Sequence, residues 1–279
     1  MRMRLHTKIG LYLGAIVTGI VMLAPFAWMI IASFQTQAEL VARPLRWWPG
    51  RFFPDRYVSI FTNPRNDVFR EALMNSLIVS VGVVIVAMVV GVLGAYAFAR
   101  LRFRFRSTIL MTFLFTYMLP QIALLIPLYL ILANVGLLDN VIGLIIVDCS
   151  LVVPFVLWIL SNYFLTVPVE LEESAWIDGA SRLGALIRIV LPSARPGLVT
   201  AAMFAFLLAW DEFMYALIFT SSTASKTVPV AVAEFSGRYS TDFGLVAAGG
   251  VLAALPPVII AAFFQRSVAS GLVAGAVKA

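Results

Sequence analysis

Three carboxylic acids interrupt otherwise apolar stretches of this 279-residue chain and are its most conspicuous candidates for chemistry. Asp148 lies in the apolar run 141–160, and Asp211 and Glu212 lie in the run 197–219. An acid at the centre of a bilayer costs about 2.5–3.5 kcal/mol on insertion scales, so such a group normally faces a cavity or a partner. These acids could accept the hydroxyl groups of a sugar, or they could relay protons.

Neighbouring residues could complete such a polar path. Trp210 and Tyr215 could stack on the face of a sugar ring, and Gln121, directly after Pro120, is a comparable polar candidate. Alternatively, the acids lie near the outer boundary of a membrane or pair with another subunit, and their role is then structural. The sequence leaves both interpretations open.

Catalytic and metal-binding chemistry has little to work with in this sequence. Its single histidine, His6, lies in a basic N-terminal segment, and its single cysteine, Cys149, lies inside an apolar run. This composition excludes a disulfide framework within the chain and a Cys-based metal cluster. The sequence also lacks the Gly-x-x-x-x-Gly-Lys-[Ser/Thr] phosphate-binding loop. We therefore expect no catalytic residues, no bound metal and no ATP site in this chain.

The polar segment 168–195 separates two apolar runs, and its first half predicts a short helix that ends in a turn. Pro168 fits the first helical turn, where its missing N–H costs nothing. Three acids follow near the N-terminus of this helix, where the helix dipole favours negative charge. They are Glu170, Glu172 and Glu173. We expect Glu172, Glu173 and Trp176 to share one face. Gly179 can adopt the left-handed conformation that ends a helix.

The second half of the same segment predicts another helix. Ser181 is a good N-cap, and Pro192 and Pro196 end the helix before the next apolar run. Four apolar residues recur at i, i+3, i+4 and i+7 and predict a one-faced stripe, namely Leu183, Leu186, Ile187 and Val190. The segment is therefore predicted to be a helix–turn–helix at a membrane surface. From these features alone, an ordinary amphipathic surface loop is an equal alternative.

Composition indicates a membrane protein. Of the residues, 62% are apolar and 12% are charged, against about 45–50% and about 25% in soluble domains. A net charge of +6 could suggest nucleic acid, but the basic residues cluster beside apolar runs, where the positive-inside rule explains them. We therefore expect a lipid bilayer and no nucleic acid as a partner. The first uncharged run, 9–38, exceeds the roughly 7–15 residues of a signal-peptide core, and we interpret it as an uncleaved span.

A membrane helix needs about 20 apolar residues, and the chain offers six such runs. Pro120 and Pro127 predict a kinked or broken helix in the third run. Basic clusters at the N-terminus and at Arg100, Arg102, Arg104 and Arg106 indicate that both termini and the segment 168–195 are cytoplasmic. The expected fold is all-α, a single polytopic domain over 1–279 with a cytoplasmic helix–turn–helix. The expected spans are 9–33, 72–99, 108–134, 141–160, 197–219 and 243–264.

One string of residues in the polar segment has a familiar spacing. Glu173-Ser174-Ala175, Gly179, Ile189 and Leu191-Pro192 resemble the EAA loop of the membrane subunits of ATP-binding-cassette (ABC) importers. That pattern is Glu-Ala-Ala, three residues, Gly, nine residues, Ile-x-Leu-Pro, and only Ser174 departs from it. Asp178-Gly179-Ala180 matches the usual Asp-Gly-Ala.

Other motifs extend this resemblance over nearly the whole chain. Asn75-Ser76, the string Trp210-Asp211-Glu212-Phe213 and the Gly-Ala-Val-Lys tail at 275–278 are similar to the shorter permease subunit of carbohydrate importers of the maltose-transporter type. In that family the residue at position 211 is commonly Asn. The presence of Asp211 here leaves a substrate contact at this position open.

The resemblance implies a permease subunit of the bacterial plasma (inner) membrane that forms half of the path for a sugar or oligosaccharide. Its partners would be an ATPase dimer, which binds ATP and Mg, a second permease subunit and an extracytoplasmic solute-binding protein. The loop would dock on the ATPase, with Glu173 paired to a basic residue and Gly179 making the turn. The docking residues implied are Glu172, Glu173, Ser174, Ala175, Asp178, Gly179, Ile189, Leu191 and Pro192.

Two other functions stay open at this point. An ABC importer of the same architecture could carry another solute, such as glycerol phosphate or a polyol. A phosphate group would need a basic pocket, and the predicted spans offer none. The chain could also be a secondary transporter driven by protons through Asp148 or Asp211. Uptake without an ATPase would favour that second alternative.

Overall fold

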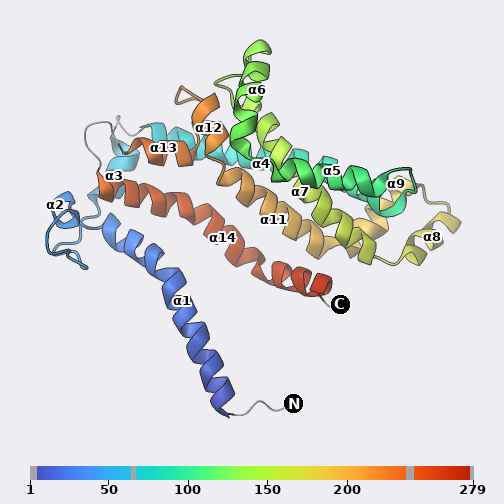
Figure 1. The fold of residues 1–279 in the computed structure, drawn as a ribbon, viewed down its shortest axis with the longest axis horizontal. Coiled ribbons are helices and arrows are strands. Elements are labelled where there is room, and N and C mark those ends of the chain that lie inside the picture. Colours follow the sequence, from blue (N-terminus) through green and yellow to red (C-terminus); the bar gives the residue numbers. More distant parts are fainter. Residues whose placement is uncertain (1–4, 64–66, 237–241, 277–279) are drawn as a thin grey trace. The chain divides into compact units, whose positions relative to one another are not determined.

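The computed structural model describes residues 5–63, 67–236 and 242–276, which form helices joined by loops (Figure 1). The prediction of an all-α fold is confirmed for these residues. The chain divides into two compact units. One unit comprises residues 1–70 and 231–255, and the other comprises residues 71–230 and 256–279. The basic residues Arg2 and Arg4 and the end of the tail, 277–279, lie outside the described residues.

The first unit contains α1 (Leu5–Ser33), α2 (Gln37–Leu40) and α3 (Asp55–Thr62). Most side chains of α1 are exposed although they are apolar, as expected of a helix that faces lipid. The loop after α1 is held by stacking of Phe34 on Phe52, whose ring centroids lie 4.2 Å apart. Arg56 is buried, forms an ion pair with Asp242 at 3.1 Å and donates to the carbonyl of Gln35. These contacts order the segment that follows the first span.

The core of the second unit lies between α4 (Asp67–Arg100), α7 (Val141–Thr166) and α11 (Arg195–Trp210). Helix α7 packs against α11. Two glycines on α4 let α4 approach α7 closely. A Cβ atom on Gly91 would lie 2.6 Å from Val156 Cγ1, and one on Gly94 would lie 2.8 Å from Leu157 Cδ1. Small residues at such contacts are typical of packed membrane helices.

The third predicted span is broken. Helices α5 (Arg106–Met118) and α6 (Gln121–Asn134) meet at 95°, and between them Leu119 and Pro120 have extended backbones. The predicted break therefore occurs at Pro120, whereas Pro127 stays inside α6. The break leaves Tyr117 at the end of one helix and Gln121 at the start of the next.

The fifth predicted span, 197–219, is not one continuous helix. Helix α11 ends at Trp210, and α12 (Met214–Phe219) begins after a short gap. The carboxylate of Glu212 accepts the N–H groups of Tyr215 at 2.8 Å and Ala216 at 3.0 Å, so it starts the new helix instead of continuing the old one. The 16 residues of α11 reach about 24 Å, which is less than the roughly 30 Å of a bilayer core.

Four helical stretches are long and apolar enough to cross a membrane, namely Lys8–Ser33, Val68–Arg100, Val141–Thr166 and Phe243–Gln265. The last belongs to α14 (Phe243–Ala276). Two bent pairs also qualify by composition, α5 with α6, and Arg182–Ser193 with α11 at 83°. The described residues thus offer up to six spans, which is the predicted number, although the second bent pair includes part of the predicted loop 168–195.

Two polar residues from distant parts of the second unit fix the segment between α12 and α13 (Val228–Glu234). Asp139, in the turn before α7, accepts the N–H groups of Ser221 and Ser222, both at 2.9 Å, and the hydroxyl of Ser225. The backbone donors hold the pKa of the Asp139 carboxyl well below its usual range. On α4, Asn75 donates to the carbonyls of Thr223 and Lys226, both at 3.0 Å. The Asn75-Ser76 motif therefore has a structural role.

Candidate functional site

The polar segment 168–195 begins with α8 (Val169–Ile177), which ends in a glycine turn as predicted. Gly179 has a φ of 85°, in the region that favours glycine. Its N–H donates to the carbonyl of Trp176 at 3.1 Å, and the N–H of Ala180 donates to the carbonyl of Ala175 at 2.9 Å. This pair of bonds is a Schellman motif, which satisfies the last carbonyls of α8 and reverses the chain.

The second helix of the segment begins at its predicted cap but is not regular. Ser181 Oγ accepts the N–H of Gly184 at 3.1 Å and starts α9 (Arg182–Ala185). A π-helical turn (Leu186–Val190) and α10 (Leu191–Ser193) follow. The predicted apolar stripe is wrong in part, because Leu183 and Ile187 are 57% and 54% exposed. The wider π turn changes the spacing, so the buried set is Ala185, Leu186 and Val190.

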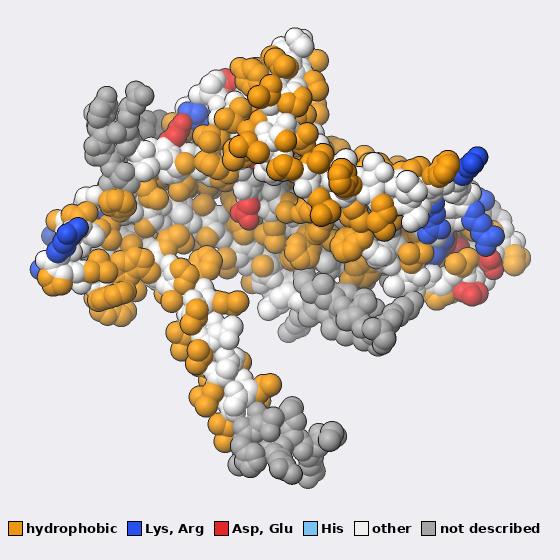
Figure 2. Space-filling view, viewed as in Figure 1, with side chains coloured by type: hydrophobic (Ala, Val, Ile, Leu, Met, Phe, Trp, Pro, Cys, Tyr) orange, Lys and Arg blue, Asp and Glu red, His pale blue; other side chains and the backbone are white. Residues whose placement is uncertain are grey.

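Most of the expected docking residues lie on the surface of this helix–turn–helix. The exposed ones are Glu173, Ser174, Asp178, Gly179 and Pro192, and the half-buried ones are Ala175, Ile189 and Leu191. In Figure 2, charged side chains gather at the end of the second unit that carries α8 and α9, and hydrophobic side chains cover much of the visible surface around α5 to α7. This distribution suits a segment that leaves the bilayer.

Glu172 departs from the surface position expected for it. Its side chain is 0% exposed, forms an ion pair with Arg100 and accepts the hydroxyl of Tyr96 at 2.9 Å. Glu172 therefore does not share a face with Glu173 and Trp176, because it turns toward the end of α4. The contact also shows that the arginine cluster starting at Arg100 and the segment 168–195 lie at the same end of the second unit.

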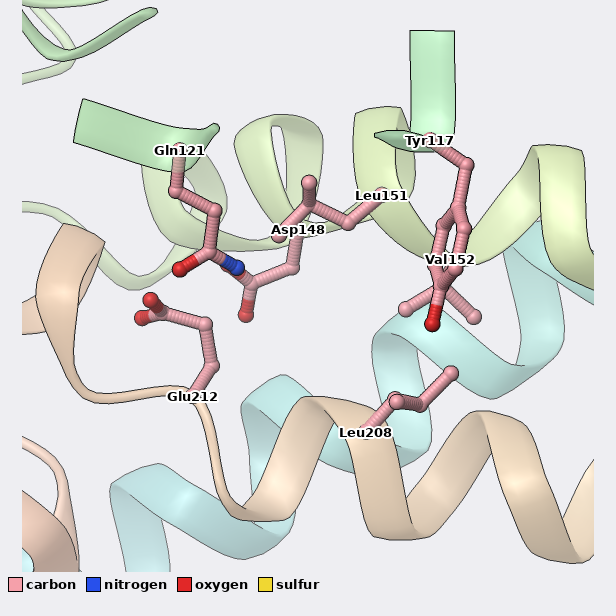
Figure 3. Close-up of a pocket in the computed structure, with 7 residues that line it drawn as sticks. All are labelled: Tyr117, Gln121, Asp148, Leu151, Val152, Leu208 and Glu212. Atoms are coloured by element: carbon pink, nitrogen blue, oxygen red, sulfur yellow. The ribbon is translucent and has the colours of Figure 1, made fainter. Parts of the chain in front are cut away.

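Two of the three acids of the prediction, Asp148 and Glu212, meet at a cavity of about 220 Å³ in the second unit (Figure 3). The broken third span supplies Tyr117 and Gln121 from its two helices, and α7 supplies Asp148. Figure 3 shows the side chains of Gln121 and Glu212 pointing toward each other beside Asp148. The cavity is lined by Tyr117, Gln121, Asp148, Leu151, Val152, Leu208 and Glu212. Two of these seven residues are acids and none is basic.

The acids at this cavity differ in how their oxygens are used. Asp148 is only 2% exposed, and among the described residues its Oδ1 has no hydrogen-bond partner. Both carboxylate oxygens of Glu212 instead accept hydrogen bonds from N–H groups in the first turn of α12. Asp211 is exposed and lines an adjoining groove of about 540 Å³, which shares Gln121 and Glu212 with the cavity. Of the two acids that line the cavity, Asp148 is therefore the one with free hydrogen-bonding capacity.

The expectation that Trp210 or Tyr215 stacks on a sugar is wrong for this arrangement. Trp210 is 3% exposed and stacks on Phe206 with centroids 5.5 Å apart. Tyr215 is 0% exposed and lies parallel to Phe219, also at 5.5 Å. The aromatic residue that does line the cavity is Tyr117, which the sequence reasoning missed. Its signal was its position beside the proline break, four residues before Gln121.

No group of three or more His, Cys, Asp or Glu side chains within the described ranges could hold a metal ion. The candidate functional features of the described residues are an exposed helix–turn–helix and a small cavity that two acids line.

Comparison with known proteins gives a consistent family. Residues 87–273 match a family described as binding-protein-dependent transport system inner membrane component. The inner membrane ABC transporter permease protein YcjP of Escherichia coli K12 is 37% identical over 99% of this chain and 98% of that protein. The trehalose/maltose transport system permease protein MalG of Thermococcus litoralis is 36% identical over 100% of this chain and 99% of that protein.

A solved structure supports the fold. A chain of a bacterial ABC transporter involved in the import of the acidic polysaccharide alginate superposes with a TM-score of 0.75. The alignment covers 95% of this chain and 99% of that one at 21% identity. At this identity the similarity establishes the architecture of the helices and leaves the solute open.

Proposed function

Because this chain belongs to the family of binding-protein-dependent transport system inner membrane components, we propose that it is a permease subunit of an importer for sugars or oligosaccharides. It is an ABC importer permease and a multi-pass inner membrane protein. The proposal adds the class of solute, the subunit contacts and the orientation in the membrane. Under it, the chain forms half of the translocation path.

The observation that carries the coupling proposal is the ordered reversal of the chain at Gly179. The helix before this turn, α8, carries the exposed carboxylate of Glu173. An ATPase subunit can move the membrane helices only if its contact with this chain is rigid. In this proposal Glu173 pairs with a basic residue of the ATPase, and the Schellman turn keeps α8 and α9 in a fixed relation. ATP and Mg bind to the ATPase and not to this chain.

The orientation and the other partners follow from the same proposal. The arginine cluster that starts at Arg100 and the segment 168–195, here called the docking loop, lie at the same end of the second unit. Under the positive-inside rule this supports a cytoplasmic position for both. With an even number of spans, both termini are then cytoplasmic. A second permease subunit completes the path, and an extracytoplasmic solute-binding protein delivers the solute.

The acidic cavity supports a solute that is rich in hydroxyl groups and carries no negative charge. Hydroxyls can donate to the free oxygen of Asp148, and the amide of Gln121 can both donate and accept. An anion such as a phosphate ester would meet two acids and no base. The MalG relative is named for trehalose and maltose, which are neutral sugars.

Reconstitution tests the coupling most simply. The chain is placed in proteoliposomes with its second permease subunit and solute-binding protein, with or without the ATPase subunit. We expect uptake of labelled sugar only when the ATPase and ATP are present. Uptake driven by a proton gradient without the ATPase would favour the alternative of a secondary transporter that uses Asp148 or Asp211.

The same assay distinguishes the alternative solutes. Maltose or trehalose, a polyol and glycerol phosphate are offered in parallel, each with the solute-binding protein of the importer. Preferential uptake of glycerol phosphate would contradict the charge argument from the cavity.

A further inference from the structure

A buried ion pair joins the docking loop to a membrane helix that is remote from it in sequence. Arg100 is the last residue of α4, and Glu172 lies 72 residues later on α8. The side chain of Arg100 is 6% exposed and that of Glu172 is 0% exposed. Arg100 Nε donates to Glu172 Oε1, while the hydroxyl of Tyr96 donates to Glu172 Oε2 at 2.9 Å.

Arg100 also reaches the other side of the loop. One of its terminal nitrogens donates to the carbonyl of Val167 at 2.7 Å, just before α8 begins. Arginine can hold a carboxylate and a carbonyl at once because its donors form a rigid planar fork. Tyr96, Arg100 and Glu172 are here called the α4–α8 latch. Their hydrogen bonds hold both α8, through Glu172, and the chain just before it, through the carbonyl of Val167.

The location of this ion pair makes a purely stabilising role a poor explanation. Removing two charges from water costs several kcal/mol per ion, and well-packed apolar residues often stabilise a fold equally well. Buried pairs are best attested where they fix a register between elements. Here the two elements are the end of a membrane helix and the loop proposed to contact the ATPase.

The connectivity of the chain gives the latch a mechanical consequence. The loop is joined covalently to α7 before it and α11 after it, but not to α4. We propose that the α4–α8 latch makes α8 and the end of α4 move as one body, so that displacement of the docking loop is passed directly to α4. This inference rests on the proposed function, because it needs an ATPase that displaces the loop. Tyr96, Arg100 and Glu172 are then positioning residues.

Four variants of the assembled importer test the latch. Tyr96→Phe removes one hydrogen bond and keeps the ring, and Arg100→Met leaves Glu172 unpaired. The double variant Arg100→Met/Glu172→Met replaces the ion pair by apolar side chains, which preserves folding where a single buried charge would not. Arg102→Met is the matched control, because Arg102 is exposed and lies two residues beyond the latch.

The measurement is sugar uptake per ATP hydrolysed in proteoliposomes. We expect Tyr96→Phe and the double variant to assemble and hydrolyse ATP, and to lose roughly tenfold in uptake per ATP, equivalent to one lost hydrogen bond to a charged group. Arg102→Met should match the wild type. Wild-type coupling in the double variant would overturn the proposal, because packing alone would then suffice. If Arg100→Met fails to assemble, Tyr96→Phe and the double variant still decide.

A distance measurement separates transmission from a merely structural role. Spin labels are placed at positions 102 and 170, both exposed, in a Cys149→Ser background. In the wild type we expect the same distance distribution with and without ATP, and in Tyr96→Phe a distribution that broadens or shifts with ATP. A wild-type distance that changes with ATP would contradict the latch. Absence of ATP-dependent uptake in the wild type would instead refute the proposed function itself.

Discussion

The docking loop and the acidic cavity use buried polar groups in opposite ways. In the loop, both carboxylate oxygens of Glu172 have donors within the chain, and so do the carbonyls of Ser174, Ala175 and Trp176 at the end of α8. At the cavity, Asp148 Oδ1 has no partner among the described residues, although the side chain is almost fully buried. An unpaired buried polar group costs about 1–3 kcal/mol, so folding stability alone favours the first arrangement.

This difference fits the roles proposed for the two regions. A loop with satisfied polar groups is rigid and can transmit force from a partner without changing shape. A cavity with an unsatisfied polar atom has binding capacity left for a molecule that passes through it. Substitutions in and around the two regions test this contrast.

Glu173→Lys should cause the largest loss, because it reverses the charge that the ATPase is proposed to pair with. Removing one partner of a hydrogen-bonded charge pair costs roughly 2–5 kcal/mol at an interface. The affinity of the membrane subunits for the ATPase, measured by titration in nanodiscs, should therefore fall by about 30-fold or more. Glu170→Lys is the control, since Glu170 is also an exposed acid on α8. Equal losses for both variants would contradict a specific contact at Glu173.

Asp148→Ala should impair transport and stabilise the protein at once. A sugar hydroxyl that loses its hydrogen bond to Asp148 is left buried and unsatisfied, which costs about 1–3 kcal/mol, so the KM for sugar uptake should rise by roughly 5-fold to 150-fold. Removal of an unpartnered buried oxygen should raise Tm, because the folded state no longer has to bury it. Cys149→Ala, at the adjacent position, should leave KM unchanged. An unchanged KM for Asp148→Ala would show that the cavity does not contact the sugar.

Much of the loop could be predicted because its signals are local. Gly179, Ser181 and Pro120 end or start helices through bonds to residues at most five positions away, and all three act where the sequence indicated. The pairing of Glu172 with Arg100 spans 72 residues and could not be read from local spacing. The helix break at Glu212 was missed because an apolar run continues on both sides of it.

The side chains around the cavity show the same limit. Whether an aromatic ring faces a cavity or packs in the core depends on which helix covers it. Trp210 is covered by Phe206, one turn away on its own helix, and Tyr215 by Phe219. Tyr117 is placed by the angle between α5 and α6, which the sequence marked only as a break.

Gly179→Ala tests whether the turn matters for coupling beyond its effect on stability. A non-glycine residue in the left-handed region costs about 1–2 kcal/mol. Gly136→Ala is a matched control, because Gly136 has a φ of 69° in the turn after α6 and, as at Gly179, an added Cβ would meet nothing within 4 Å. Both variants should lower Tm similarly, but only Gly179→Ala should lower uptake per ATP. Similar coupling in the two would contradict a special role for the turn.

Asp139 provides the smallest effect and a dependence on pH. Its pKa is lowered in the folded state, mainly by the N–H groups of Ser221 and Ser222, so its contribution to stability is complete above its unfolded pKa of about 3.9. That contribution is lost as the pH falls below this value. The Tm difference between the wild type and Asp139→Asn should therefore shrink as the pH is lowered from about 5 to about 3. A constant difference would contradict the assignment.

The proposed function depends most on the loop 168–195 being the contact with a separate ATPase. A photo-reactive amino acid at position 177, where Ile177 is 87% exposed at the end of α8, tests that contact in the assembled importer. The reference position is 146, where Ile146 is 53% exposed on α7. We predict a crosslink to the ATPase subunit from position 177 and none from position 146. A crosslink from position 177 only to lipid, to the second permease subunit or to the solute-binding protein would contradict the account.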